Sequence, residues 1–396
     1  MEGKLPDFNN TEIAFAIRGN RELKKMAWLF KWMANPLLTK WLGKLGSWAI
    51  QNHFPFAKDI VLSTLFYQFC GGRTLLETEK AITNLKSFGV HTILDYGAEG
   101  KSKEDELNYT MNELLRAIEF SSGQNGIPAI GVKLTGLVKN SVLEKISQKQ
   151  WDIHEESALA IPYYKNFLKR IDTICHAAAE KNIRVAIDAE ESWMQWAIDE
   201  IVTWMMERYN KNGVVVYHTF QMYRTDRLAY LKDSLDRAKT KGYYLGAKLV
   251  RGAYMDKERK RALEHGYPSP IQPNKMATDT AFDSAVLFCL ENRSHIALIN
   301  ASHNANSCYL QAKYMIEHQI PTQSEDLGFS QLFGMSDNLT FGLAKVHFNV
   351  SKYVPYGQVK EVIPYLVRRA EENTSVTGDM SRELNMIQAE IKRRGL

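Results

Sequence analysis

The stretch TDRLAYLKDSLDRAKTKGYYLGAKLVRGAY, residues 225–254, joins a helical pattern to a short aliphatic run, and this pairing decides the fold. The first part is expected to be a helix that ends at Gly242, because glycine is common just after the last helical residue. The second part, residues 244–254, is expected to be a strand of a parallel sheet, since such strands are buried on both faces and read as nearly continuous apolar runs.

Seven further runs of this kind alternate with helical patterns from about Thr92 onward. They cover residues 92–99, 129–137, 183–191, 214–223, 296–304, 327–335 and 352–357. Eight alternating units predict a closed (β/α)8 barrel of the α/β class rather than a doubly wound sheet. A doubly wound sheet has five or six strands and a glycine-rich first turn, and the sequence contains no such turn.

The composition is that of a globular protein of ordinary charge. Of the 396 residues, 45% are hydrophobic and 24% are charged, and the net charge is +5, so a nucleic-acid partner is not expected. The cysteines lie far apart without metal-ligand spacing, so no metal site is expected. No run approaches about 18 apolar residues and no secretory signal is recognisable, which predicts a cytoplasmic protein, peripheral at most on the inner face of a membrane.

The chain is expected to have three parts: an N-terminal helical arm over residues 1–90, the barrel over residues 91–376, and a C-terminal helix packed on the barrel over residues 377–396. The arm is expected to contain two helices that are separated at Asn35-Pro36, because proline interrupts a helix.

The arm also combines aromatic and basic side chains. Trp28, Trp32, Trp41 and Trp48 stand among lysines. Two interpretations remain open. The arm is either a candidate for docking on an anionic membrane surface or an ordinary amphipathic arm that packs on the barrel.

Polar side chains occur at the ends of seven of the eight predicted strands. They are Asp95, Glu99, Lys133, Asp188, Glu190, Gln221, Lys248, Arg251, Tyr254, Ser302, His303 and Tyr353. In a parallel barrel the carboxyl ends of the strands form one mouth, so these residues are expected to converge there. The alternative is that they are only solvated loop residues.

The stretch VIPYLVRRAEEN, residues 362–373, predicts a helix with an unusual face. Tyr365, Arg368, Arg369 and Glu372 follow at i, i+3, i+4 and i+7, where a globular helix normally places apolar residues. Arginine forks can bind a carboxylate with paired, charge-assisted bonds. A solvated, salt-bridged helix face is the alternative interpretation.

Four strings in this order and spacing, GAKLVRGAYM, IDAEES, KYVPYG and YLVRRAEEN, identify the chain as similar to the proline dehydrogenase (proline oxidase) family. The resemblance extends from about Asp95 to Asn373. It implies an FAD-dependent (β/α)8 barrel that oxidises L-proline to pyrroline-5-carboxylate, with hydride passing to flavin N5 and electrons passing on to a membrane quinone. Lys248 stands where bacterial members usually carry arginine, so the chain looks more like the eukaryotic-type, monofunctional branch.

The resemblance also implies roles for individual residues. Lys133, Arg368 and Arg369 would bind the proline carboxylate, and Leu332, Tyr353 and Tyr365 would wall the ring. Asp188, Lys248 and Tyr254 fall at catalytic positions. The positions that would contact FAD are Ala189, Gln221, Val250, Arg251, Gly252, Ala253, Ser302, His303 and Glu372.

Two other functions remain open. The chain could oxidise hydroxyproline or another cyclic amino acid as a different enzyme of the same family. It could also be a flavin-free barrel that only binds amino acids.

Overall fold

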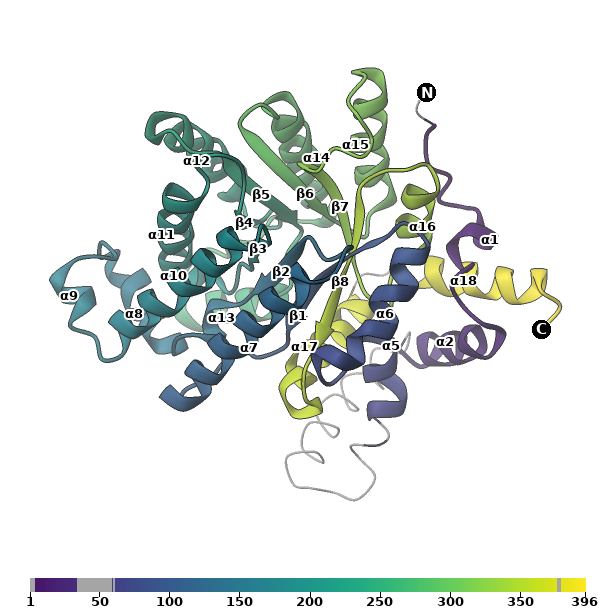
Figure 1. Cartoon of the computed structure of the whole chain (residues 1–396), viewed down its shortest axis with the longest axis horizontal. Helices are drawn as coiled ribbons and strands as arrows, with labels where there is room; N and C mark the ends of the chain where they lie inside the picture. The colour runs from purple at the N-terminus through teal and green to yellow at the C-terminus, as the bar shows by residue number, and fades with distance from the viewer. Residues whose placement is uncertain (1–3, 34–58, 60, 376–378) are drawn as a thin grey trace. The chain divides into compact units, whose positions relative to one another are not determined.

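The computed structural model describes residues 4–33, 59, 61–375 and 379–396, except for the side chains of residues 370–381. The described residues form eight strands (Figure 1). Their bounds are β1 His91–Tyr96, β2 Ala129–Val132, β3 Arg184–Ile187, β4 Val216–Gln221, β5 Leu245–Val250, β6 Ile296–Ala301, β7 Leu327–Leu332 and β8 Val350–Tyr356. Each strand overlaps one of the runs predicted from the sequence.

The strands follow one another in chain order around a closed barrel. Neighbours are parallel: His91 of β1 lies opposite Ser351 of β8, and Val132 of β2 lies opposite Ile187 of β3. Strand β5 pairs with both β4 and β6. The predicted (β/α)8 barrel is therefore confirmed. Because parallel neighbours end on the same side, the register brings the carboxyl ends of paired strands together.

The chain divides into two compact units. The first comprises residues 1–97, 303–323 and 329–396, and the second comprises residues 98–302 and 324–328.

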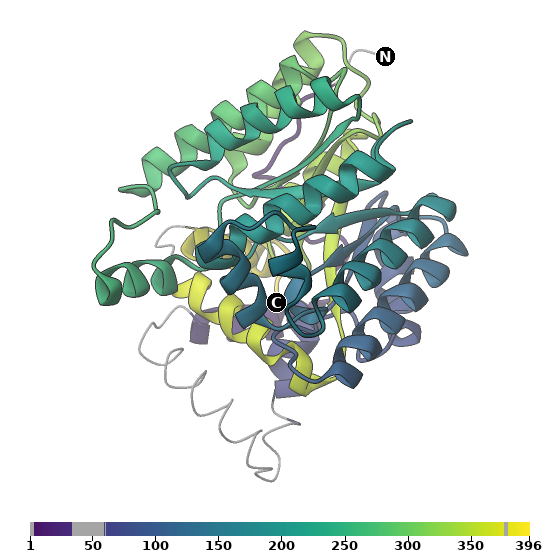
Figure 2. The same ribbon diagram turned by 90° about the vertical axis from the view of Figure 1, so that its left-hand side faces the viewer.

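In the second unit, helices run along the strands, as Figure 2 shows. The helices of this unit are α7 Glu104–Ser122, α8 Asn140–Lys149, α9 Glu156–Leu159, α10 Tyr164–Glu180, α11 Ser192–Tyr209, α12 Arg227–Lys241, α13 Met255–His265 and α14 Lys275–Glu291. Of these, α7, α10, α11, α12 and α14 pack against strands. Helix α11 packs against α8 and β4. Helix α12 ends as predicted, with Gly242 in the left-handed region at φ +66°, where glycine carries no Cβ penalty.

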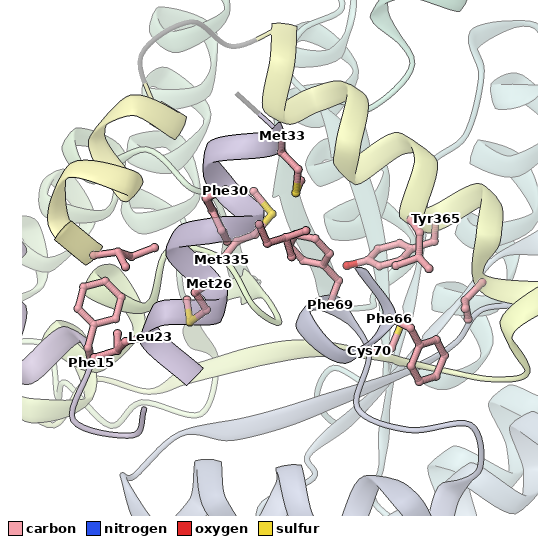
Figure 3. Packing of buried hydrophobic residues seen from close by; sticks show 14 of the residues in the cluster. Phe15, Leu23, Met26, Phe30, Met33, Phe66, Phe69, Cys70, Met335 and Tyr365 are labelled. Atoms are coloured by element: carbon pink, nitrogen blue, oxygen red, sulfur yellow. The ribbon is translucent and has the colours of Figure 1, made fainter. Parts of the chain in front are cut away.

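In the first unit, helices from both ends of the chain share one hydrophobic cluster (Figure 3). The helices of this unit are α1 Thr11–Ala14, α2 Asn20–Met33, α5 Tyr67–Phe69, α6 Leu75–Ser87, α15 Ala305–Glu317, α16 Asp337–Lys345, α17 Val359–Ser375 and α18 Asp379–Arg393, with a π-helical turn η1 at Leu62–Phe66. The cluster is built from α1, α2, η1, α5, α17 and α18. Helix α2 contributes Leu23, Met26, Phe30 and Met33, which recur at helical spacing along one face. Part of the N-terminal arm is therefore core.

The exposed side of α2 carries two tryptophans among basic residues. Trp28 and Trp32 are 51% and 47% exposed, and their ring centroids are 5.6 Å apart. The predicted break at Asn35-Pro36, and Trp41 and Trp48, lie outside the described residues. The predicted boundaries of the arm, the barrel and the C-terminal helix stay predictions. Among the described helices, none is long and apolar enough to cross a membrane.

Candidate active site

Two lysines surround one carboxylate at the strand ends of the second unit. Lys248 Nζ in β5 lies 2.6 Å from Asp188 Oδ1, and Lys133 Nζ lies 3.3 Å from Asp188 Oδ2. All three side chains are largely buried. The Asp188 N–H donates to the Val132 carbonyl at 2.8 Å, so the β2–β3 ladder continues beyond the strands and aligns Asp188 with Lys133. The cluster carries one excess positive charge, which attracts an anion.

A second contact between the same two loops lies two residues further along each. Glu190 accepts hydrogen bonds from the N–H of Thr135 at 3.0 Å and from its hydroxyl at 2.6 Å. Burial, opposed by these hydrogen bonds and assisted by the charge of Glu191, raises the pKa of Glu190 to about 8. Burial therefore favours the neutral form of the Glu190 carboxyl.

The backbone of Glu190 is held as tightly as its side chain. Its N–H donates to Gln195 Oε1 at 2.9 Å, and its carbonyl accepts from Gln221 Nε2 at 2.7 Å. Gln195 in turn donates to the buried Asp199 at 2.8 Å. The side-chain amide of Gln221, a predicted cofactor contact, is thus oriented by the loop that bears Asp188.

Arg251, just after β5, is fixed by three partners. Its Nε donates to Asp279 Oδ1 at 2.7 Å, its Nη1 donates to Ser302 Oγ at 2.6 Å, and its guanidinium lies 4.4 Å from the centroid of the Phe282 ring. Burial alone would raise the pKa of Asp279, but hydrogen bonds from Lys275 and Arg251 hold that pKa below its usual value. The structure therefore brings together two residues predicted to contact FAD, Arg251 and Ser302.

The ring of Tyr223 lies very close to Gly252. It adopts φ +135°, and a Cβ there would lie 2.4 Å from a ring carbon of Tyr223. Tyr223 also donates its N–H to the Arg251 carbonyl at 2.7 Å. The glycine is thus required by the packing of Tyr223, whatever binds on its other side. Val250 ends β5, and Tyr254 is buried just before α13.

The first unit holds the predicted substrate residues of α17. Tyr365 and Arg369 are both buried, and the guanidinium carbon of Arg369 lies 5.3 Å from the centroid of the Tyr365 ring. This contact follows from the i, i+4 spacing on one helix face. Arg368 is half-buried. A buried Arg369 thus does not fit a solvated helix face. Glu372 lies in α17, but its side chain is outside the described set.

The remaining predicted residues of this unit stand on β7, β8 and the loop after β6. Leu332 ends β7, and Tyr353 is buried in the middle of β8. His303 Nδ1 lies 2.8 Å from the hydroxyl of Ser336, whose own N–H donates to Glu383 of α18 at 2.9 Å. Ser336 therefore links helix α18 to His303, which is a predicted cofactor contact.

Several supporting residues escaped prediction from the sequence. Thr135, Gln195, Asp279 and Ser336 each bond to a predicted site residue or to the loop that bears one. Glu190 differs from these four, because the sequence marks it as a carboxylate at the end of a predicted strand. The others are ordinary polar residues whose partners lie at unrelated positions in the chain.

Comparisons with known proteins identify relatives of this chain. The proline dehydrogenase family model matches residues 78–382. Among curated proteins, the chain is 38% identical over 241 residues to "Proline dehydrogenase 1, mitochondrial" of Drosophila melanogaster, covering 58% of this chain and 35% of the relative. It is 32% identical over 371 residues to the protein of the same name from Dictyostelium discoideum, covering 84% of this chain and 65% of the relative.

A third relative carries a different name. "Hydroxyproline dehydrogenase" of Xenopus laevis is 32% identical over 362 residues, covering 84% of this chain and 78% of the relative. Among solved structures, proline utilization A from Bdellovibrio bacteriovorus matches with a TM-score of 0.75 at 20% identity, covering 93% of this chain and 42% of that chain, and this likeness shows the fold. The family match covers more than half of the sequence. This chain belongs to the proline dehydrogenase family.

Proposed function

We propose that this protein is an FAD-dependent dehydrogenase that oxidises L-proline to pyrroline-5-carboxylate. The observation that carries the proposal is the pairing of Asp188 with Lys133 and Lys248 at the strand ends of a family barrel. A fixed, largely buried cluster with an excess positive charge suits an anionic substrate and a cofactor that becomes negatively charged on reduction.

The residues of the second unit fit a flavin dinucleotide. Arg251 is a pre-oriented guanidinium, suited to a phosphate group, and Gly252 is held without a side chain by Tyr223. Gln221 presents an amide fixed by Glu190, suited to ring heteroatoms. We assign further contacts to Ala189, Val250, Ala253, Ser302, His303 and Glu372. When bound, the flavin supplies the redox chemistry, taking hydride at N5 and passing electrons on to a quinone.

The protein's own residues bind and orient the substrate. Lys133, Arg368 and Arg369 neutralise the carboxylate, and Leu332, Tyr353 and Tyr365 surround the pyrrolidine ring. Burial of Arg369 against Tyr365 supports this role, since it places a guanidinium suited to a carboxylate on the same helix face as a proposed wall of the ring. Asp188 holds the Lys248 ammonium in place beside the reacting centre. We assign Tyr254 a catalytic role together with these two residues. The proline nitrogen reacts in its neutral form, because its lone pair assists departure of the hydride.

The quinone acceptor suggests contact with a membrane surface. The exposed pair Trp28 and Trp32 on the lysine-bearing helix α2 supports peripheral docking, because tryptophan partitions into the membrane interface and lysine is attracted to anionic lipids. We propose a cytoplasmic location at the inner face of a membrane. The Drosophila and Dictyostelium relatives are named mitochondrial, and the same docking mode would serve there.

The Xenopus relative gives a second candidate function, the oxidation of hydroxyproline. Turnover of L-proline and hydroxyproline with a soluble dye as acceptor separates the two. A higher kcat/KM for L-proline supports the proposal, and a higher value for hydroxyproline contradicts it in favour of the alternative.

A further inference from the structure

A five-residue segment upstream of the family match lies next to the predicted walls of the substrate ring: it contacts β8 and the loop after β7, and it packs in one cluster with residues of α17. The segment, residues 68–72, has the sequence QFCGG, and the family model begins at residue 78. The wall residues are Leu332, at the end of β7, Tyr353 in β8 and Tyr365 in α17. All of them belong to the first compact unit.

Gln68 contacts the loop that follows β7. Its buried side chain donates from Nε2 to the Gly334 carbonyl at 2.7 Å. Gly334 adopts φ +81°, and a Cβ there would lie 2.0 Å from the Gln68 carbonyl oxygen. The two backbones therefore approach so closely that only glycine fits. Since the loop starts directly after Leu332, this contact sets the position of that wall.

Phe69 supports Tyr365. It is fully buried and packs in the same hydrophobic cluster as Tyr365, and Leu332 packs against that cluster. Figure 3 shows the Tyr365 side chain pointing toward Phe69, with Cys70 and Phe66 nearby. Protein interiors are close-packed, so the volume of Phe69 limits how far the Tyr365 ring can retreat.

The two glycines continue the segment along β8. The Gly71 N–H donates to the Pro355 carbonyl at 2.8 Å, and Gly72 forms a parallel bridge with Tyr356. A Cβ on Gly71 would lie 2.4 Å from Cγ1 of Val354. The segment thus lies against β8 directly after Tyr353.

We propose that residues 68–72 determine the specificity of the substrate site by positioning Leu332, Tyr353 and Tyr365, and so select the ring size of the cyclic amino acid. The inference rests on the proposed function. The segment contacts residues next to the walls or packed with them, so we assign Gln68 and Phe69 as positioning residues. When a pocket gains room for one more methylene group, the ratio of kcat/KM between substrates that differ by that group changes on the order of tenfold.

The test compares L-proline with L-pipecolate, whose ring is one carbon larger, in dye-coupled assays of the FAD-loaded full chain. The variants are Phe69→Leu, which shrinks the support of Tyr365, and Gln68→Met, which removes the bond to Gly334 at similar volume. The matched control is Phe15→Leu. Phe15 is equally buried in the same cluster, and Figure 3 shows it beside Leu23, away from Tyr365.

In Phe69→Leu and Gln68→Met, the ratio of kcat/KM for pipecolate to that for proline should rise about tenfold, and the KM for proline should rise. In Phe15→Leu, the ratio should stay at the wild-type value, although the melting temperature falls. If the wild type is active and the ratio is unchanged in both test variants, the inference about residues 68–72 is wrong, whereas the proposed function stands. A wild type that oxidises neither compound contradicts the proposed function as well. If Phe69→Leu does not fold, Gln68→Met decides the matter.

Discussion

Lys248 and Asp188 form an ion pair, with 2.6 Å between Nζ and Oδ1, although 60 residues separate them in the chain. The second oxygen of the same carboxylate lies 3.3 Å from the Lys133 ammonium. One aspartate therefore orients two cations. Removing either lysine changes the local charge without removing the aspartate, so the contribution of each cation can be tested separately.

Replacement of Lys248 by methionine should lower kcat for proline oxidation on the order of a hundredfold, because a pre-oriented charge at the reacting centre is lost. Lys248→Arg keeps the charge and should retain most of the activity. Lys181→Met is the control, since Lys181 forms an exposed ion pair of 2.8 Å with Glu119. Equal rates for Lys248→Met and Lys181→Met would remove Lys248 from the catalytic assignment.

Glu190→Gln should flatten the dependence of stability on pH. Burial raises the pKa of Glu190 from its ordinary value of 4.5 to about 8 in the folded protein. Below pH 4.5 both states are protonated and the stabilisation is fully present. Between pH 4.5 and pH 8 the Glu190 carboxyl loses its proton in the unfolded state but keeps it in the folded state. The free energy of unfolding therefore falls as the pH rises through this range. Glutamine does not titrate.

Urea unfolding at pH 5.5 and pH 8.5 measures this difference. The wild type should lose more stability between the two values than Glu190→Gln does, because all other titrating groups are shared. The same loss in both proteins would show that Glu190 is ionised in the folded state throughout.

Gly252→Ala should reduce both thermal stability and flavin content. A Cβ at Gly252 meets the Tyr223 ring at 2.4 Å, which displaces the loop that carries Arg251. Gly213→Ala is a matched control, because Gly213 has a similar φ of +138° with nothing within 4 Å of the added Cβ. Backbone strain of about 1–3 kcal/mol is common to both variants. Flavin loss in Gly252→Ala alone is the expected result, and equal flavin content in both would contradict it.

The double variant Trp28→Ser, Trp32→Ser should bind anionic liposomes more weakly and still reduce a soluble dye at the wild-type rate. The reason is that both rings are exposed on α2, whereas its core face is untouched. Leu263→Ser, Met276→Ser removes two other exposed apolar side chains and should not alter liposome binding. Unchanged binding by the tryptophan variant would remove α2 from the membrane contact.

The barrel could be predicted from the sequence because strands buried on both faces leave continuous apolar runs. Their ends were harder to place. The run at residues 129–137 was predicted as one strand, but β2 ends at Val132, and a 3-10 turn follows at Leu134–Gly136. That turn is buried, so its apolar residues resemble a strand. Burial and strand geometry cannot be told apart in a short apolar stretch.

The site was partly predictable for a related reason. Lys133, Asp188 and Lys248 were visible because charged residues at strand ends stand out against apolar runs. The contact between Gln68 and Gly334 gave no signal, since 266 residues separate the partners. The bond between Arg251 and Asp279 was equally hidden, because any of several acidic residues could have paired with that arginine. Long-range polar contacts depend on the folded backbone and have no local pattern.

We propose above all that this barrel holds a flavin that proline reduces. The most direct measurement is the absorption spectrum of the purified full chain under anaerobic conditions, before and after addition of L-proline. We expect a band at about 450 nm, where oxidised flavin absorbs, and its bleaching by proline. A colourless protein that binds proline without taking up FAD, or a flavin band that proline leaves unchanged, would contradict the account.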